Sequence, residues 1–271
     1  KVTLTAKWRD IYTAFEYDYV KNESGSIIGV IIKKYHNTYE KVVEIPTKLQ
    51  NYTVIAIGMD AFKNNPYIER IIVPNTVTTL EEYAFANVPN LKEVVLHSTI
   101  TSYGANLFAG NSKLETITLF SHFNQELKYL FEDNIDNIPS TLKTIKYVYS
   151  GGLIDATMWK NRIANHEITL ILDESFTSIP DETFKDATYL TSIVLPNTII
   201  YIGEAAFANS GLRTINLPDS ITIISANTFK DCRFLTTIII PTSVTTIGEY
   251  AFANCTDVTA IYMDDSVMTI G

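Results

Sequence analysis

The chain has only two cysteines among 271 residues, which excludes a scaffold held by many disulfides and leaves the redox compartment open. Charged residues make up only 19% of the chain and include no basic run, so we expect no nucleic-acid partner. The formal net charge of −9 also disfavours an anionic membrane surface. No apolar stretch reaches the roughly 18 residues that a membrane-spanning helix needs, so we expect no direct membrane insertion.

The motifs of the common catalytic sites are absent as well. The chain contains no H-E-x-x-H, G-x-S-x-G, P-loop or G-x-G-x-x-G pattern. Its four histidines are scattered and are interpreted as structural or solvated: His36, His97, His122 and His166. We therefore expect no enzyme, no catalytic residue, no cofactor and no metal.

Two weaker patterns have ordinary explanations. The glycine-rich stretch at 23–29 lies between apolar runs and has the residues that a hairpin turn requires. Two pairs of aspartates could hold a calcium ion, but solvated loop carboxylates are far commoner: Asp133 with Asp136, and Asp264 with Asp265.

What the chain does have is a repeat. A phenylalanine marks each copy: Phe62, Phe85, Phe108, Phe131, Phe184, Phe207, Phe229 and Phe252. Within each run of four, the markers are 22 or 23 residues apart. A fixed period in this range is the sequence signature of a solenoid.

Aliphatic residues recur at fixed distances after the marker, in the pattern L-x-x-I-x-L-P, as in 235–241. The alternating I-x-L part predicts a very short strand with one buried face, and proline ends the strand because it offers no backbone donor. Such a strand is not stable alone. We therefore expect the strands to stack, about 4.8 Å apart, into one parallel sheet.

The rest of each copy predicts the opposite side of a coil. A second aliphatic pair, often a glycine and then Ala-Phe follow the strand, and we interpret this stretch as a turn that leads into about one helical turn. A coil of this kind is typical of a leucine-rich-repeat solenoid. The stretch "LTTIIIPTSVTTIGEYAFANC" at 235–255 closely resembles the BspA-like leucine-rich repeats of surface proteins, over about 54–271.

The predicted fold is thus a right-handed leucine-rich-repeat solenoid with an N-terminal β cap. Short parallel strands line its concave face, and short helical turns or extended segments line its convex face. We expect a capping segment at 11–53, in which "VEIP" aligns with "IIVP" of 71–74, and a repeat array at 54–271 that is truncated within a repeat. Segment 1–10 is interpreted as a linker or a remnant of a preceding module, because 2–8 resembles the last strand of an internalin-type B-repeat.

The repeats are irregular at about 120–175, where Phe131 keeps the marker and Trp159 replaces it. Drift in a tolerant solenoid and a bulge shaped for a ligand both explain this. Cys232 and Cys255 each follow a marker by three residues, so stacking puts them close enough for a disulfide. Small or apolar residues in the same position of other repeats favour buried free thiols instead.

The residues that flank the buried isoleucine of each strand should point outward on the concave face. They form the candidate binding surface: Arg70, Ile72, Glu93, Val95, Thr116, Thr118, Lys146, Val194, Asn216, Ile239 and Tyr262. Such a strip of threonine and aliphatic residues suits contact with a protein or glycan. Equally, these residue types occur there simply because they favour extended backbone.

The resemblance implies a monomeric, non-enzymatic binding or adhesion module of a secreted or cell-surface bacterial protein. Its ligand would be a protein or a glycan. An export signal and an anchor would lie outside this sequence. The alternative is a rigid spacer, or an accessory region of a larger surface protein or enzyme.

Overall fold

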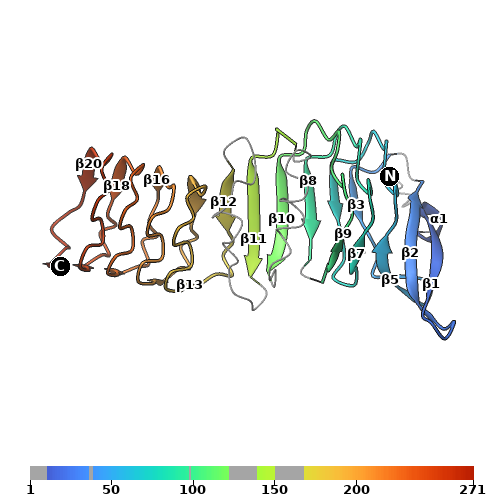
Figure 1. Ribbon diagram of the computed structural model, residues 1–271, viewed down its shortest axis with the longest axis horizontal. Coiled ribbons are helices and arrows are strands. Elements are labelled where there is room, and N and C mark those ends of the chain that lie inside the picture. The colour runs from blue at the N-terminus through green and yellow to red at the C-terminus, as the bar shows by residue number, and fades with distance from the viewer. Residues whose placement is uncertain (1–10, 37–38, 98, 122–138, 150–167) are drawn as a thin grey trace, which may run out of the picture. The chain divides into compact units, whose positions relative to one another are not determined.

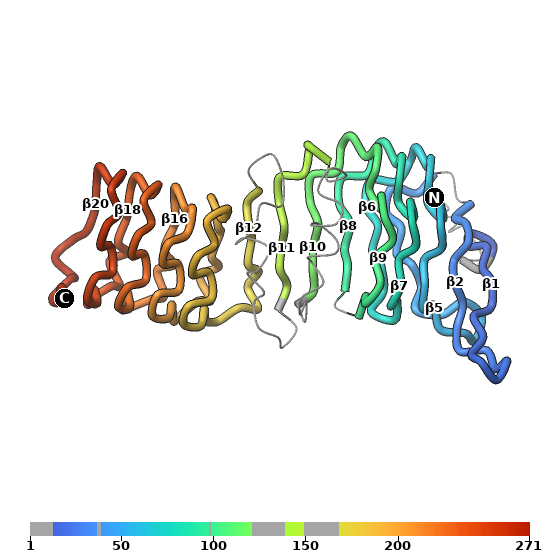
Figure 2. Tube along the Cα trace, viewed as in Figure 1, coloured from blue at the N-terminus to red at the C-terminus, as the bar shows by residue number. Residues whose placement is uncertain are grey.

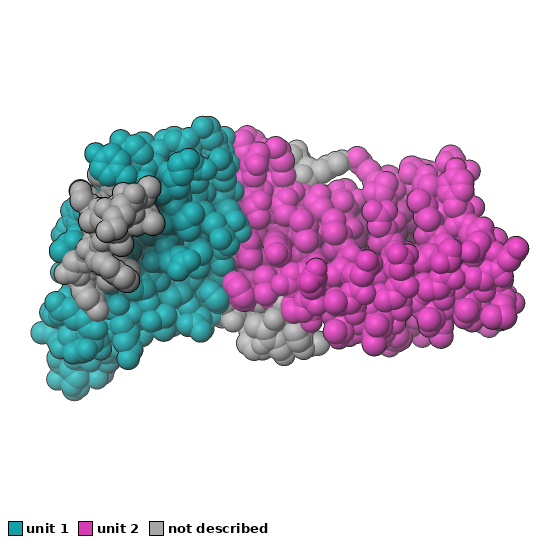
Figure 3. All heavy atoms as spheres, turned by 180° about the vertical axis from the view of Figure 1, so that it is seen from behind, with its two compact units in different colours: residues 1–114 teal, residues 115–271 magenta. Residues whose placement is uncertain are grey.

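The structure is a computed structural model that describes residues 11–36, 39–97, 99–121, 139–149 and 168–271. It divides into two compact units, residues 1–114 and residues 115–271 (Figure 3). Several sequence predictions lie outside the described residues: the segment 1–10, Phe131, Trp159, His122, His166, Asp133 and Asp136.

One wall of each unit, here the long-strand wall, is a parallel ladder formed by the I-x-L segments (Figure 1). In unit 1 it contains β3 (Val42–Glu44), β6 (Arg70–Ile72) and β8 (Glu93–Leu96). In unit 2 it contains β10 (Thr116–Ser121), β11 (Thr144–Tyr149), β12 (Thr169–Leu172), β14 (Ser192–Val194) and β16 (Thr214–Ile215), followed by the separate pair β18 (Thr237–Ile239) and β20 (Ala260–Tyr262).

The register of the long-strand wall confirms the stacked aliphatic spine. Val43, Ile71 and Val94 are direct partners in unit 1, and Ile193 pairs with Ile215 in unit 2. All five side chains are buried. The predicted alignment of "VEIP" with "IIVP" is also confirmed, because Val43 lies opposite Ile71.

The second aliphatic pair of each copy forms another parallel ladder, the short-strand wall. In unit 1 it contains β5 (Tyr52–Ile57), β7 (Thr79–Leu80) and β9 (Ser102–Tyr103). In unit 2 it contains β13 (Ser178–Ile179) with β15 (Tyr201–Ile202), and then β17 (Ile223–Ile224) with β19 (Thr246–Ile247) and β21 (Thr269–Ile270). This ladder is the extended form expected for that side.

The segments around the phenylalanine markers form the third side of each coil, here the turn wall. The helical turn expected there is not found in the described residues. Two residues per coil have left-handed backbone, which interrupts any helical run: Asp60, Asn64, Tyr83, Asn87, Asn106, Glu182, Asp186, Ala205, Asn209, Asn227, Asp231, Tyr250 and Asn254, with Gly110 at the equivalent place. Instead, backbone amides donate to the next coil, for example from Phe207 to the carbonyl of Thr228 at 2.9 Å.

Successive coils lie side by side within each unit (Figure 2), and the marker rings stack from coil to coil. In unit 2, the centroids of Phe184, Phe207, Phe229 and Phe252 are 5.3, 5.5 and 5.4 Å apart, and the planes of neighbouring rings differ by 6° or less. In unit 1, Phe62, Phe85 and Phe108 continue a stack that begins at Tyr35, whose ring lies 5.3 Å from Phe62. Tyr35 thus takes the place of the marker that the capping segment lacks.

The cap itself is an antiparallel hairpin of β1 (Phe15–Lys21) and β2 (Ile27–Tyr35), preceded by the four-residue helix α1 (Ile11–Ala14). Its turn contains Gly25, whose φ of 81° suits glycine. β2 pairs in parallel with β5, and the two-residue β4 (Lys48–Leu49) pairs antiparallel with β5. Phe15 packs 5.0 Å from the Tyr35 ring, so the hairpin covers the start of the aromatic stack.

Both strand ladders of unit 2 are interrupted next to the coil that lies between Phe207 and Phe229. Within residues 168–271, β16 is not paired with β18, and β15 is not paired with β17. The Ser225 hydroxyl donates to the carbonyl of Ile202 at 2.6 Å there, whereas the turn wall and the ring stack continue. The short step coincides with the break only on the short-strand wall, where β17 begins 22 residues after β15; on the long-strand wall β16 begins 22 residues after β14 and remains paired with it.

Candidate interaction surface

The outward side chains of the long-strand wall vary in exposure along the chain. Arg70, Ile72, Glu93, Thr116 and Lys146 are partly exposed. In the C-terminal half of unit 2, the residue that follows each spine isoleucine is exposed to solvent. These residues are Val194, Asn216, Ile239 and Tyr262, the last with 61% of its surface exposed.

Two predicted surface residues are buried, which corrects the sequence analysis. Val95 is only 3% exposed and Thr118 only 5%. Val95 lies in register with Ile72 and Thr118 with Lys146, each on a neighbouring strand. Alternation along a strand sets the direction of a side chain, but its exposure also depends on the side chains of the strands on either side, which are only about 4.8 Å away. Neither residue belongs to the candidate surface.

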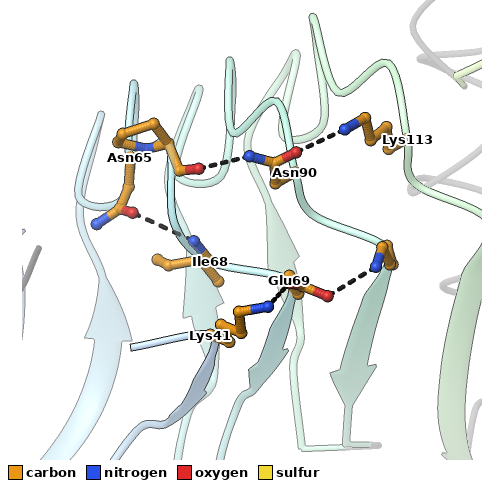
Figure 4. Close-up of polar contacts among 8 residues, drawn as sticks. Lys41, Asn65, Ile68, Glu69, Asn90 and Lys113 are labelled. Atoms are coloured by element: carbon orange, nitrogen blue, oxygen red, sulfur yellow. Dashed lines mark hydrogen bonds and ion pairs between the residues drawn. The ribbon is translucent and has the colours of Figure 1, made fainter. Parts of the chain in front are cut away.

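The charged part of this wall is internally paired. Arg70 Nε lies 2.9 Å from Glu93 Oε2 on the neighbouring strand. Just before the same strands, Glu69 accepts from Lys41 Nζ and from Lys92 Nζ, both at 2.7 Å (Figure 4). These two ammonium groups lower the pKa of Glu69 from 4.5 to about 2. The charged side chains named here are therefore paired with one another across neighbouring coils.

The Lys41–Glu69–Lys92 bridge was not predicted, although the sequence contains a signal for it. The residues that precede or begin successive strands alternate in sign: Lys41, Glu69, Lys92, Glu115 and Lys143. Opposite charges one coil apart lie side by side in a parallel stack. Within unit 2, Lys143 Nζ likewise lies 2.8 Å from Glu115 Oε1.

A second polar row lies at the edge of unit 1, next to these ion pairs (Figure 4). Asn90 Nδ2 donates to the carbonyl of Pro66 at 2.7 Å, and Lys113 Nζ donates to Asn90 Oδ1 at 2.7 Å. The amide of Ile68 donates to Asn65 Oδ1 at 3.3 Å. The two bonds of Asn90 join successive coils and the bond of Asn65 closes a turn within one coil, so all three have a structural role.

The groups most suited to catalysis or metal binding are dispersed. His36 Nε2 lies 2.9 Å from Glu16 Oε2, and partial burial lowers the pKa of His97. Asp264 accepts from the amide of Ser266 at 3.0 Å, as a loop carboxylate does. Among the described residues, no group of three or more His, Cys, Asp or Glu side chains could hold a metal ion. The part of the chain that the structure describes also has no helix with the length and apolar character needed to cross a membrane.

Both cysteines are free thiols. Cys232 Sγ lies 3.1 Å from the carbonyl of Phe207, and Cys255 Sγ lies 3.1 Å from the carbonyl of Phe229. In the equivalent position, Asn111 Nδ2 donates to the carbonyl of Phe85 at 2.9 Å. The three side chains therefore have the same structural role, since each donates a hydrogen bond to the backbone carbonyl of the marker phenylalanine in the preceding coil.

Comparisons with solved structures find leucine-rich repeat proteins at low identity. A T. pallidum leucine rich repeat protein is 17% identical, with a TM-score of 0.32, over 96% of this chain and 84% of that one. A leucine rich cell surface protein from Faecalibacterium prausnitzii is 18% identical, with a TM-score of 0.32, over 92% and 94%. The pneumococcal vaccine antigen PcpA is 15% identical, with a TM-score of 0.35, over 95% and 80%.

A comparison with curated proteins finds no match. The family model of the BspA type leucine rich repeat region matches residues 34–151 and 154–271, with six copies. These two ranges include most of the chain, and the repeat that they match is the coil described above. The chain belongs to the BspA-type leucine-rich repeat family.

Proposed function

We propose that this chain is a non-enzymatic binding or adhesion module of a secreted or cell-surface bacterial protein. It presents the outward side of the long-strand wall to a protein or glycan partner. Membership of the BspA-type family supports this class of function. The observation that carries the proposal is the exposure of Val194, Ile239 and Tyr262 on that wall.

These three side chains contribute little to the coil that they belong to. The inward neighbours Ile193 and Ile238 are buried and form the spine, whereas the outward residues face water. Exposed apolar residues repeated along one direction give an extended contact strip, which a rigid repeat can hold in place without ordering cost. Tyr262 adds a ring and a hydroxyl, a combination suited to both protein and sugar surfaces.

The direct test is binding of the full chain to a glycan array and to an array of purified extracellular proteins. We expect a ligand that is captured by the wild type and lost in the double variant I239K/Y262K. Met268→Lys adds one lysine on the short-strand wall, where Met268 is exposed, and should leave capture unchanged. Equal capture by the wild type and the double variant would reject the long-strand wall as the binding surface.

A second candidate function, a rigid spacer without a ligand, is favoured by the continuity of the turn wall. In unit 2 the turn-wall hydrogen bonds and the marker stack run through the coil at which both strand ladders are interrupted. A spacer requires stiffness and needs no ligand-binding surface. Absence of capture on both arrays would favour this function over the first.

A further inference from the structure

The outward positions of the short-strand wall are often filled by threonine or serine. Two such positions occur per coil, one just before the two-residue strand and one at its start. Four of the eight described coils have threonine or serine at both positions: Thr78 and Thr79, Thr101 and Ser102, Thr177 and Ser178, Thr245 and Thr246. The first coil has Ile55 and Ala56 there, and Met268 stands in the first position of the coil with β21. Between them, two successive coils carry Ile200, Tyr201 and Ile223.

These three residues, here the short-strand patch, are exposed large side chains. Ile200 is 67% exposed, Tyr201 49% and Ile223 52%. Their inward neighbours Ile202 and Ile224 are buried, so the coil does not need the patch residues for its core. Burial in this fold therefore gives no reason for replacing threonine at these positions.

The patch spans two successive coils. Tyr201 begins β15 and Ile223 begins β17, so the two residues hold the same position one coil apart. The hydrogen bond from Ser225 Oγ to the carbonyl of Ile202 holds these coils together. Ile200 directly precedes Tyr201 and also faces outward. The result is one aliphatic and aromatic area within a surface of hydroxyl groups.

The surroundings of the patch are acidic. The segments 173–184, 196–207, 218–229 and 241–252, which carry the short strands of unit 2, contain no lysine or arginine. They contain seven carboxylates: Asp173, Glu174, Asp181, Glu182, Glu204, Asp219 and Glu249. Of these, Glu182 forms an ion pair with Lys185, which lies just beyond its segment. Glu174 and Asp219 precede the short strands, whereas Asp181 and Glu204 follow them, and all four are exposed. Acidic groups thus border both ends of the patch.

One of these carboxylates also positions the patch. Tyr201 OH donates to Asp181 Oδ1 at 3.0 Å, and the amide of Glu204 donates to the same oxygen at 2.9 Å. The ring of Tyr201 is therefore held in place beside two carboxylates. An apolar area with fixed negative charge around it is complementary to apolar side chains flanked by cations.

We propose that the short-strand patch binds an extended segment of a partner protein in which apolar residues alternate with lysine or arginine. The apolar side chains pack on Ile200, Tyr201 and Ile223, and the cations reach the carboxylates around them. This binding surface lies on a different wall from the one proposed above and does not depend on it.

The test uses short synthetic peptides and the full chain, with titration calorimetry. The probe alternates lysine and valine, one control alternates lysine and serine, and another alternates glutamate and valine. We expect saturable binding of the Lys-Val peptide, at least about tenfold weaker binding of Lys-Ser, and no binding of Glu-Val. Added salt should weaken the Lys-Val complex, because its charges are solvent-exposed.

The matched variant is I200T/Y201T/I223T, which introduces the residue type found at these positions in other coils. We expect it to keep the unfolding midpoint of the wild type and to bind the Lys-Val peptide at least about tenfold more weakly. The double variant I239K/Y262K on the long-strand wall should bind this peptide as the wild type does. These two results separate the short-strand patch from the surface proposed for function.

A second variant, E204Q/D219N, keeps the shape of the surface and removes two charges. This variant should bind the Lys-Val peptide more weakly than the wild type, and its affinity should depend less on salt concentration. The proposal is overturned if Lys-Ser binds as tightly as Lys-Val, if neither variant loses affinity, or if the Lys-Val peptide does not bind at all.

Discussion

At the scale of single residues, backbone conformation explains why asparagine recurs in the turn wall. The residue two positions after each marker has positive φ, and in the described coils it is Asn64, Asn87, Gly110, Asp186, Asn209, Asp231 or Asn254. Glycine, asparagine and aspartate are the residues that adopt this backbone most readily. The final asparagine of the repeated "AFAN" is therefore a conformational requirement of the turn.

The first prediction concerns Asn209, whose φ is 55° and whose amide nitrogen donates to Asp186 Oδ1 at 2.9 Å. Asn209→Gly and Asn209→Val both remove this side-chain bond, so their difference isolates the backbone effect. We expect Asn209→Val to be less stable than Asn209→Gly by about 1–2 kcal/mol, because a β-branched residue is strained at positive φ. Urea unfolding of the two variants measures the difference, and equal stability would contradict the conformational explanation.

The second prediction concerns the marker stack. Phe207 is buried between two rings whose centroids lie 5.3 and 5.5 Å from its own. We expect Phe207→Ala to lower the free energy of unfolding by about 3–5 kcal/mol, because it leaves a cavity between parallel rings. Phe234→Ala is the control, since Phe234 is exposed and should change stability by no more than about 0.5 kcal/mol. Similar losses in both variants would mean that stacking is not what stabilises the coil.

The third prediction concerns Cys255. Burial, and then the nearby Cys232, raise the pKa of this thiol from 9.0 to about 12. Above pH 9 the unfolded state loses this proton while the folded state keeps it, so rising pH favours unfolding. We expect stability to fall between pH 9 and 12, and to fall less steeply in Cys255→Ala. Urea unfolding of both proteins across this range tests it, and parallel curves would contradict it.

At the scale of elements, Glu69 joins three strands through their preceding loops. Two ammonium groups hold its pKa near 2, so the contribution of this bridge to stability is present above about pH 4.5 and is lost as pH falls through about 2. We expect the Glu69 carboxyl carbon to titrate near pH 2 in an NMR experiment. In K41A/K92A its midpoint should move up toward 4.5. An ordinary midpoint in the wild type would show that the bridge is not formed in solution.

The long-strand wall could be predicted from sequence because its signal is strong. Ile71, Ile193 and Ile238 recur with period-two neighbours, and stacking is the only way for such short strands to bury them. The turn wall was harder, because Ala-Phe within a polar stretch suits one helical turn as well as two tight turns. The asparagine two residues after each marker favours the tight turns, because asparagine readily adopts left-handed backbone. The hydrophobic pattern alone does not distinguish the two structures.

The candidate surface was predictable only in part. Alternation along a strand identifies which residues point outward, such as Ile239 and Tyr262, but it does not give their exposure. Val95 and Thr118 hold outward positions and are nevertheless buried, because exposure depends on how the neighbouring coils pack and not on one strand alone. Pairing of Arg70 with Glu93 likewise follows from the register between coils, which a single strand does not contain.

At the scale of the whole molecule, stability in a solenoid is a sum over coils and their interfaces. The spine residue Ile261 and the neighbouring Met263 are exposed in the last coil, although their equivalents Ile238 and Ile240 are buried one coil earlier. We expect amide hydrogens of β20 and β21 to exchange faster than those of β12 and β14, because the spine residue Ile261 is exposed whereas Leu170 and Ile193 are buried. Hydrogen exchange measured by mass spectrometry tests this, and uniform protection across unit 2 would contradict it.

The threonine-filled outward positions have a consequence at the level of the gene. In the standard genetic code, a single C-to-U change in the second base turns any threonine codon into one for isoleucine or methionine. Ile200 stands where the neighbouring coils have Thr177 and Thr222, and Met268 stands where the preceding coil has Thr245. A coil can therefore acquire an adhesive side chain by one nucleotide substitution while its interior stays unchanged, so new binding specificities can arise in this lineage without loss of the fold.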